Sequence, residues 1–118
     1  MKTILVVDDE WAIAEVLEAL LGDEGYRVIV ANNGKQGLKR LEEWRPDLIM
    51  LDFMMPIMDG PATFAVLKAD PATSSIPVIL MSSLPEETVA ERCAGYSAFL
   101  RKPFRIAAVL EAIGTALC

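Results

Sequence analysis

The chain has 118 residues, of which 53% are hydrophobic and 24% charged, and this balance excludes a disordered protein and predicts one globular domain. Its net charge of −6 disfavours nucleic acid or an anionic membrane as the direct partner of this segment. Because the chain has no histidine, a bound metal would be one that oxygen ligands hold, namely magnesium, calcium or manganese.

The cysteines and the N-terminus indicate a compartment for the chain. Cys93 and Cys118 have neither the spacing of a metal site nor that of a disulfide framework. The first residues lack the pattern of a signal peptide, and no apolar run is long enough to span a membrane. We therefore expect a protein of the reducing cytoplasm.

Five short apolar runs alternate with helical patterns along the chain. The runs cover residues 4–7, 28–30, 48–51, 78–81 and 98–100. They are continuous rather than alternating, which is typical of strands that helices cover on both faces.

The first two predicted helices follow the first two runs. The first carries one apolar stripe, formed by Ile13, Val16, Leu17 and Leu20. Gly22 or Gly25 is expected to end it. The second helix is predicted over 34–44, and Pro46 prevents its continuation.

Three more helices are predicted in the second half of the chain. The third begins at the N-cap residue Asp59 and runs to about Ala69, with Phe64 and Leu67 facing inward. The fourth, over 85–94, has few apolar positions. The last carries an apolar stripe of Ile106, Val109, Leu110, Ile113 and Leu117.

This alternation of strand and helix predicts a parallel sheet with helices on both faces and right-handed crossovers. Ligands of such sheets bind outside the carboxyl ends of the strands. Those ends carry Asp8, Asp9, Asp52, Ser82, Ser83 and Lys102. Taken singly, each is an ordinary cap, turn or surface residue, but their joint occurrence at one sheet edge favours a site.

The chemistry of these residues favours the binding of a phosphoryl group. Carboxylates that lie close together need a compensating charge, which a divalent cation with oxygen ligands supplies. Lys102 adds a positive group, and transfer of a phosphoryl group depends mostly on positioning and charge neutralisation. No nucleotide-binding glycine motif occurs, so the acceptor is predicted to be a carboxylate of the site itself. Glu10 is assigned to the start of the first helix, and Trp11 is expected near the metal.

Four segments together resemble the receiver domain of two-component response regulators. They are VVDDE (6–10), LIMLDFMMPIMDG (48–60), PVILMSS (77–83) and FLRKPF (99–104). The resemblance extends from about residue 2 to residue 117 and implies a single receiver domain over 1–118. It implies a flavodoxin-like (βα)5 fold, a doubly wound parallel sheet of five strands in the order 2-1-3-4-5.

The resemblance also implies roles for the residues of the site. Asp52 matches the phosphoacceptor, Lys102 the lysine that pairs with the phosphoryl group, and Ser82 the hydroxyl that binds a phosphoryl oxygen. Ser82 and Phe99 match a switch in which the ring turns inward when the hydroxyl moves. The bond between Lys102 and Pro103 is expected to be cis, as in the family.

Magnesium is the cofactor that the resemblance implies, with Mn²⁺ as a possible substitute. Asp9 matches the direct ligand and Asp8 a ligand that acts largely through water. Asp52 and the backbone carbonyl of Met54 match the remaining protein ligands.

The resemblance further implies the partners of the chain. A sensor histidine kinase or a histidine phosphotransfer protein would supply the phosphoryl group, because this chain has no histidine. Phosphorylation would switch the face near the fourth helix, fifth strand and fifth helix, where a downstream protein or output domain binds. The chain would catalyse only its own phosphorylation and dephosphorylation. The apolar last helix is compatible with a homodimer, although its alanines are equally explained by helix propensity.

Two details differ from the common pattern of the family. The stretch from Ser82 to Lys102 is slightly short, so the fourth helix is expected to be brief, mobile or partly unwound. The positions two residues beyond the phosphoacceptor and the switch hydroxyl, which influence hydrolysis in the family, are the apolar Met54 and Leu84. We therefore expect a comparatively long-lived phosphorylated form.

Other classes of protein fit the sequence less well. A phosphatase with an aspartate nucleophile has a DxD arrangement after its first strand, whereas Asp8 and Asp9 are adjacent here. A binding module that has lost phosphorylation would lack a key residue, and all are present. A flavodoxin would have a phosphate-binding loop after the first strand, which is missing.

Overall fold

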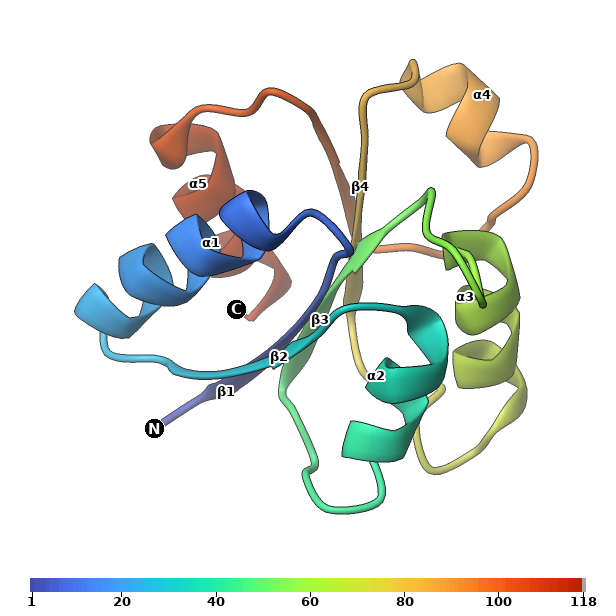
Figure 1. Ribbon diagram of the computed structural model, residues 1–118, viewed down its shortest axis with the longest axis horizontal. Helices are drawn as coiled ribbons and strands as arrows, with labels where there is room; N and C mark the ends of the chain where they lie inside the picture. Colours follow the sequence, from blue (N-terminus) through green and yellow to red (C-terminus); the bar gives the residue numbers. More distant parts are fainter. Residues whose placement is uncertain (118) are drawn as a thin grey trace.

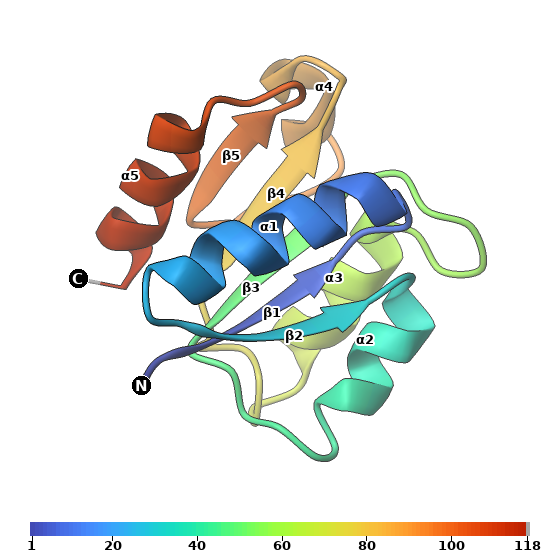
Figure 2. The ribbon, with the colours of Figure 1, turned by 60° about the vertical axis from the view of Figure 1, so that its left-hand side comes forward.

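The computed structural model describes residues 1–117 and contains one parallel sheet between two layers of helices (Figure 1). The five strands lie in the order β2-β1-β3-β4-β5. They are β1 (Thr3–Val7), β2 (Arg27–Ala31), β3 (Leu48–Asp52), β4 (Val78–Ser82) and β5 (Ala98–Arg101). All neighbouring strands pair in parallel, so their carboxyl ends lie at the same edge of the sheet (Figure 2). The predicted fold and strand order are confirmed.

The helices divide between the two faces of the sheet. One face is covered by α1 (Trp11–Asp23) and α5 (Ile106–Ala116). The other is covered by α2 (Gly34–Arg40), α3 (Gly60–Ala69) and α4 (Glu86–Ala90). None of the helices in residues 1–117 is long and apolar enough to cross a membrane.

The core consists of two apolar clusters separated by the sheet. Successive side chains of a strand point to opposite faces, so Ile4 and Val6 belong to the cluster under α1 and α5, whereas Leu5 and Val7 belong to the other. Strands β3 and β4 are buried along their whole length. Burial on both faces explains why the apolar runs are continuous.

The predictions of the apolar stripes of two helices are partly wrong. Val16 is 58% exposed, because the sheet-facing side of α1 is formed by Ala14, Leu17 and Leu21, which follow the i, i+3, i+7 spacing. Ile106, the first residue of α5, is 59% exposed. The remaining members of both stripes are buried or half-buried.

The ends of the helices differ from the predicted bounds in two places. Helix α2 ends at Arg40 rather than near residue 44, because the N–H groups of Leu41, Glu42 and Glu43 donate to carbonyls three residues earlier and so form tighter turns. Helix α4 has only 5 residues instead of the predicted span 85–94. The expectation of a brief fourth helix is confirmed.

Other predicted details are confirmed. Asp59 caps α3, since its Oδ1 accepts a hydrogen bond from the Ala62 N–H at 2.9 Å. Of the two glycines proposed to end α1, Gly25 has the left-handed φ of 92°. Cys93 is buried and free, whereas Cys118 lies outside the described residues.

Candidate functional site

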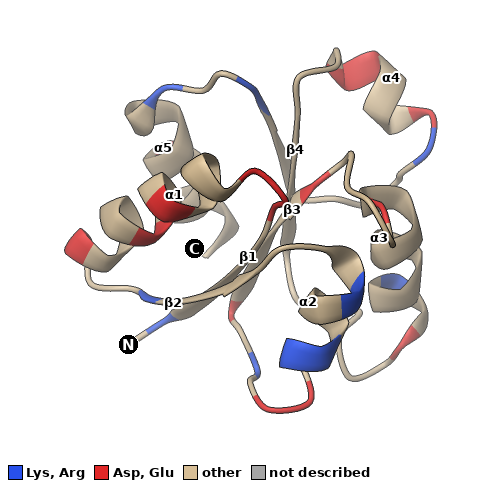
Figure 3. Ribbon diagram, in the orientation of Figure 1, with Lys and Arg blue, Asp and Glu red and all other residues tan. Residues whose placement is uncertain are grey.

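The carboxyl ends of three strands bring two acids and one lysine together. Strands β1 and β3 pair with Val7 opposite Leu51, so Asp8 and Asp52, which follow these residues, lie side by side. Figure 3 shows the acidic segments at the ends of these strands next to each other. The Lys102 N–H donates to the Ser82 carbonyl at 2.8 Å, which holds the lysine beside the end of β4.

Lys102 is the centre of this arrangement. Its Nζ lies 2.9 Å from Asp8 Oδ2, 3.2 Å from Asp52 Oδ1 and 2.7 Å from Glu10 Oε1. The side chains of Asp8 and Lys102 are 0% and 8% exposed, whereas that of Glu10 is 56% exposed. Three carboxylates therefore share one buried ammonium group.

Burial raises the pKa of both inner carboxyls. Loss of hydration is the largest cause at Asp52, and with the nearby charge of Asp8 it raises the pKa of Asp52 to about 7, although Lys102 acts in the opposite direction. A hydrogen bond with Asp9 contributes further to the raised pKa of Asp52. Burial likewise raises the pKa of Asp8, although the hydrogen bond from the Glu10 N–H and the nearby Lys102 act to lower it. The site thus has a deficit of positive charge.

Lys102 stays protonated in spite of its burial. Loss of hydration alone would lower its pKa, but its contacts with the Glu10 and Asp8 carboxylates, and the charge of Asp52, raise the pKa above its ordinary value. The lysine is therefore a permanent cation that can pair with an anionic group at the sheet edge.

The residues present fit a divalent cation. Carboxylate oxygens of Asp8, Glu10 and Asp52 all lie within 4.8 Å of one another. Asp8 Oδ2 is buried and, although close to Lys102, accepts no hydrogen bond of acceptable geometry from residues 1–117. A buried oxygen with a free lone pair beside two other carboxylates is the donor set that magnesium prefers.

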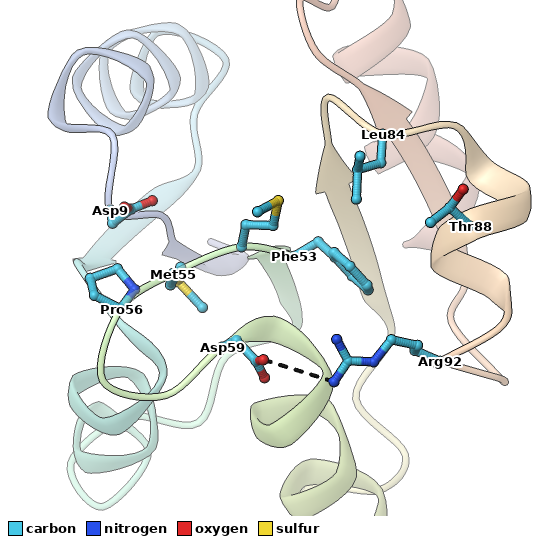
Figure 4. A pocket seen from close by; sticks show the side chains of 9 residues that line it. Asp9, Phe53, Met55, Pro56, Asp59, Leu84, Thr88 and Arg92 are labelled. Atoms are coloured by element: carbon cyan, nitrogen blue, oxygen red, sulfur yellow. Dashed lines mark ion pairs between the residues drawn. The ribbon is translucent and has the colours of Figure 1, made fainter.

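Asp9 and Met54 lie on the open side of the site. Both line a cleft of about 640 Å³ between the loop after β3 and α4 (Figure 4). Asp9 and Met54 are exposed, the latter by 61%. The carboxylate cluster around Lys102 contains Glu10 rather than Asp9, so the structure brings Asp9 near Asp52 without placing it in that cluster.

The predicted switch residues lie on the neighbouring strands β4 and β5. Ser82 is 2% exposed at the end of β4, and its hydroxyl accepts a hydrogen bond from the Leu84 N–H at 3.0 Å. Phe99 is half-buried on β5 and packs against the same apolar cluster as Leu84. The Lys102–Pro103 bond is cis, as expected.

A close backbone contact fixes the position of α3 at the end of β3. The Gly60 N–H donates to the Phe53 carbonyl at 2.9 Å. A Cβ atom on Gly60 would lie 2.5 Å from the Asp52 carbonyl oxygen and 2.6 Å from Phe53 Cα. Only glycine therefore allows α3 to begin directly against the residue that follows the central acid.

Two residues of the site were not predicted from the sequence. The sequence places Glu10 only at the helix start, but its side chain binds Lys102. The length of this side chain, unusual at an N-cap, is the signal in the sequence. Arg92 lies 5.7 Å from the centre of the Phe53 ring and 3.9 Å from Asp59 across the cleft (Figure 4). It is the only basic residue between Leu84 and Phe99.

Trp11 is exposed at the start of α1. Its side chain is 78% exposed and lines a small pocket with Glu15 and Glu18. Because Trp11 follows Glu10 directly, we expect its fluorescence to report magnesium binding.

Comparisons with known proteins point to one family. The sequence model of the response regulator receiver domain matches residues 4–114. The DNA-binding response regulator MtrA of Mycolicibacterium paratuberculosis is 36% identical over 106 residues, which cover 88% of this chain and 46% of MtrA. The transcriptional regulatory protein AfsQ1 of Streptomyces coelicolor is 42% identical over 83 residues, covering 70% of this chain and 36% of AfsQ1. The chain thus spans less than half the length of these relatives.

Solved structures show the same similarity. The receiver domain of a signal transduction histidine kinase from Syntrophus aciditrophicus has a TM-score of 0.90 at 34% identity, covering 99% of this chain and 90% of that one. The receiver domain of the sensor histidine kinase PA1611 from Pseudomonas aeruginosa, described with magnesium in its active site cleft, has a TM-score of 0.90 at 29% identity, covering 98% and 97%. The chain belongs to the response regulator receiver domain family of two-component signalling.

Proposed function

We propose that this receiver domain accepts a phosphoryl group on Asp52 from a phosphohistidine of a partner protein, in a reaction that depends on magnesium. One observation carries the proposal, the buried contact of the Lys102 ammonium with Asp52 and Asp8 at the open edge of the sheet. A carboxylate beside a permanent cation and a second acid has the groups that phosphoryl transfer requires.

The residues of the site have distinct roles in the proposed reaction. A carboxylate oxygen of Asp52 attacks phosphorus, a bond between oxygen and phosphorus forms, and the bond between phosphorus and the donor's imidazole nitrogen breaks. Lys102 neutralises charge on the phosphoryl oxygens, and the Ser82 hydroxyl donates to one of them. Burial raises the pKa of Asp52 to about 7 in the metal-free site, and a cation bound beside it would favour the ionised carboxylate that acts as the nucleophile.

Magnesium, or manganese in its place, supplies positive charge to the phosphoryl oxygens when bound. Asp8, Asp9, Asp52 and the carbonyl of Met54 are the residues that would hold it. The free lone pair on Asp8 Oδ2 supports a cation at this place. The magnesium described in the cleft of the PA1611 receiver domain supports it independently.

The partners follow from the chemistry of the donor and the family. The chain has no histidine, so the phosphohistidine belongs to a sensor kinase, a phosphotransfer protein or another domain. Ser82 and Phe99 would transmit phosphorylation to the face formed by α4, β5 and α5. Two relatives are named for DNA binding or transcription. We therefore propose that an output domain or a downstream regulator responds to this change. The exposed Ile106 on α5 is compatible with a homodimer.

The test is intact-protein mass spectrometry after incubation with acetyl phosphate and magnesium. We expect one added phosphoryl group in the wild type and in the control Asp23→Asn, which removes an exposed carboxylate at the end of α1. We expect none in Asp52→Asn or after removal of magnesium with EDTA. Addition to Asp52→Asn, or none to the wild type, would contradict the proposal. Sustained turnover of an aryl phosphate ester would indicate an enzyme instead.

A further inference from the structure

Glu10 occupies a position where a glutamate has no local purpose. It is the N-cap residue of α1, yet its side chain makes no capping hydrogen bond. Short side chains such as Asp, Asn, Ser and Thr are preferred there, because they reach the free N–H groups of the first turn. The Glu10 carboxylate instead lies 2.7 Å from Lys102 Nζ, 92 residues away in the sequence.

The hydrogen bond to Glu10 occupies a donor of the Lys102 ammonium group. An ammonium group has three N–H donors and no acceptor. Three carboxylates, those of Asp8, Glu10 and Asp52, lie within 3.2 Å of Nζ. Among the described residues, only the Glu10 carboxylate accepts a hydrogen bond from Nζ of good geometry. If Asp52 is phosphorylated as proposed above, the phosphoryl oxygens therefore compete with Glu10 for this ammonium group.

Burial determines which carboxylate can leave most easily. The Asp8 side chain is 0% exposed, and its Oδ1 also accepts the Glu10 N–H at 2.8 Å. The Asp52 side chain is 5% exposed and carries the phosphoryl group itself. The Glu10 side chain is 56% exposed, so water can replace Lys102 as its partner at little cost.

We infer that Glu10 is the exchangeable partner of Lys102, which it holds in the unphosphorylated state and releases to the phosphoryl group. Glu10 is then a positioning residue that opposes phosphorylation. Its removal should strengthen binding of a phosphoryl group, and this inference rests on the proposed function of Asp52.

Two variants separate the contact from the charge of Glu10. Glu10→Gln removes the charge and weakens the contact with Lys102. Glu10→Asp keeps the charge, but the shorter side chain cannot span the same distance and is suited to cap α1 instead. Glu15→Gln is the matched control. Glu15 is exposed in the next turn of α1, and its substitution removes the same charge as Glu10→Gln.

The experiment measures the affinity of each variant for beryllium trifluoride, a phosphoryl analogue, by ¹⁹F NMR at constant magnesium concentration. We expect both Glu10 variants to bind it about threefold to fivefold more tightly than the wild type, the size of one half-exposed ion pair. Glu15→Gln should bind like the wild type. Magnesium affinity, measured without fluoride, should be unchanged in all four proteins, because the Glu10 carboxylate is paired with Lys102 and is not among the proposed metal ligands.

Three results would overturn the inference while leaving the proposed function in place. The first is equal affinity of the wild type and both Glu10 variants. The second is tighter binding by Glu10→Gln alone, which would show an effect of charge only. The third is weaker magnesium binding in Glu10→Gln, which would make Glu10 a metal ligand. Failure of the wild type to bind the analogue would instead contradict the proposed function, and the inference with it.

Discussion

Ile57 has a backbone conformation that an isoleucine rarely adopts. Its φ is +70°, in the left-handed region, and its side chain is 79% exposed, so no burial compensates for the strain. A branched Cβ in this region costs about 1–2 kcal/mol relative to glycine. The loop after β3 is therefore under local strain beside the proposed phosphorylation site.

We predict that Ile57→Gly raises the free energy of unfolding by about 1 kcal/mol, because relief of the strain exceeds the added freedom of the unfolded chain. Urea denaturation would measure the change. Ile57→Asn should give a smaller gain, since asparagine tolerates the left-handed region, and Ile57→Ala the smallest. Equal effects of Gly and Ala would show that the exposed side chain, not the backbone, is responsible.

Met54 and Leu84 provide a second prediction at the residue scale. Both line the cleft beside Asp9, and neither side chain can orient a water molecule by hydrogen bonding. We expect the acyl phosphate to be long-lived in the wild type and to decay faster in the double variant Met54→Asn with Leu84→Glu. Mass spectrometry over time measures the rate at which the phosphoryl group is lost. An unchanged rate would mean that these side chains do not control access of water.

At the scale of elements, the short α4 contributes to one wall of the cleft beside the site. This helix has 5 residues, and its C-terminal side is linked to the rest of the fold through Arg92, which contacts the Phe53 ring and Asp59. Tyr96 adds a hydrogen bond from its hydroxyl to Glu86 at 2.8 Å. These contacts hold a helix that is too short to be stable alone.

The junction of β3 and α3 gives a prediction at the same scale. Gly60→Ala should lower the free energy of unfolding by about 1–3 kcal/mol, because the new methyl group meets the Asp52 carbonyl oxygen and Phe53 Cα, which are backbone atoms and cannot easily move. Thermal and urea unfolding measure the effect. The same variant should also reduce phosphorylation of Asp52, since relief of the clash displaces the end of β3.

Gly114→Ala is the matched control for this prediction. Gly114 lies in α5, and nothing lies within 4 Å of a Cβ added there. The substitution should raise stability by about 0.5 kcal/mol, because alanine favours the helix more than glycine does. The prediction would be wrong if the two glycine variants changed stability in the same direction.

At the scale of the whole molecule, the raised pKa of Asp52 links stability to pH. Burial raises this pKa from its ordinary value of 3.8 to about 7, so the folded state holds the proton more tightly than the unfolded state. The contribution of Asp52 to stability is therefore fully present below about pH 4 and is lost as the pH rises through about 7. Ionisation of Asp52 therefore lowers the stability of the metal-free protein.

We predict that Asp52→Asn removes this dependence in protein treated with EDTA. The variant should gain stability relative to the wild type between about pH 4 and 7, by on the order of 2 to 4 kcal/mol at the upper end. Urea denaturation at a series of pH values measures the difference. The free energy of unfolding of Asp23→Asn should change with pH as that of the wild type does. A difference between Asp52→Asn and the wild type that is the same at every pH would mean that burial does not shift the proton affinity of Asp52.

The sequence by itself determined the fold and most members of the site. Continuous apolar runs separated by helical patterns require a sheet covered on both faces, and parallel strands place Asp8, Asp52, Ser82 and Lys102 at one edge. These conclusions depend on periodicity and order along the chain, which a sequence contains in full.

Only the tertiary structure decided which groups touch. The contact of Glu10 with Lys102 joins residues 92 positions apart, and the bridge of Arg92 to Phe53 and Asp59 depends on the place where a short α4 ends. The exposure of Val16 depends on the rotation of α1 against the sheet. Such features follow from side-chain reach and packing between distant segments, on which local periodicity has no bearing.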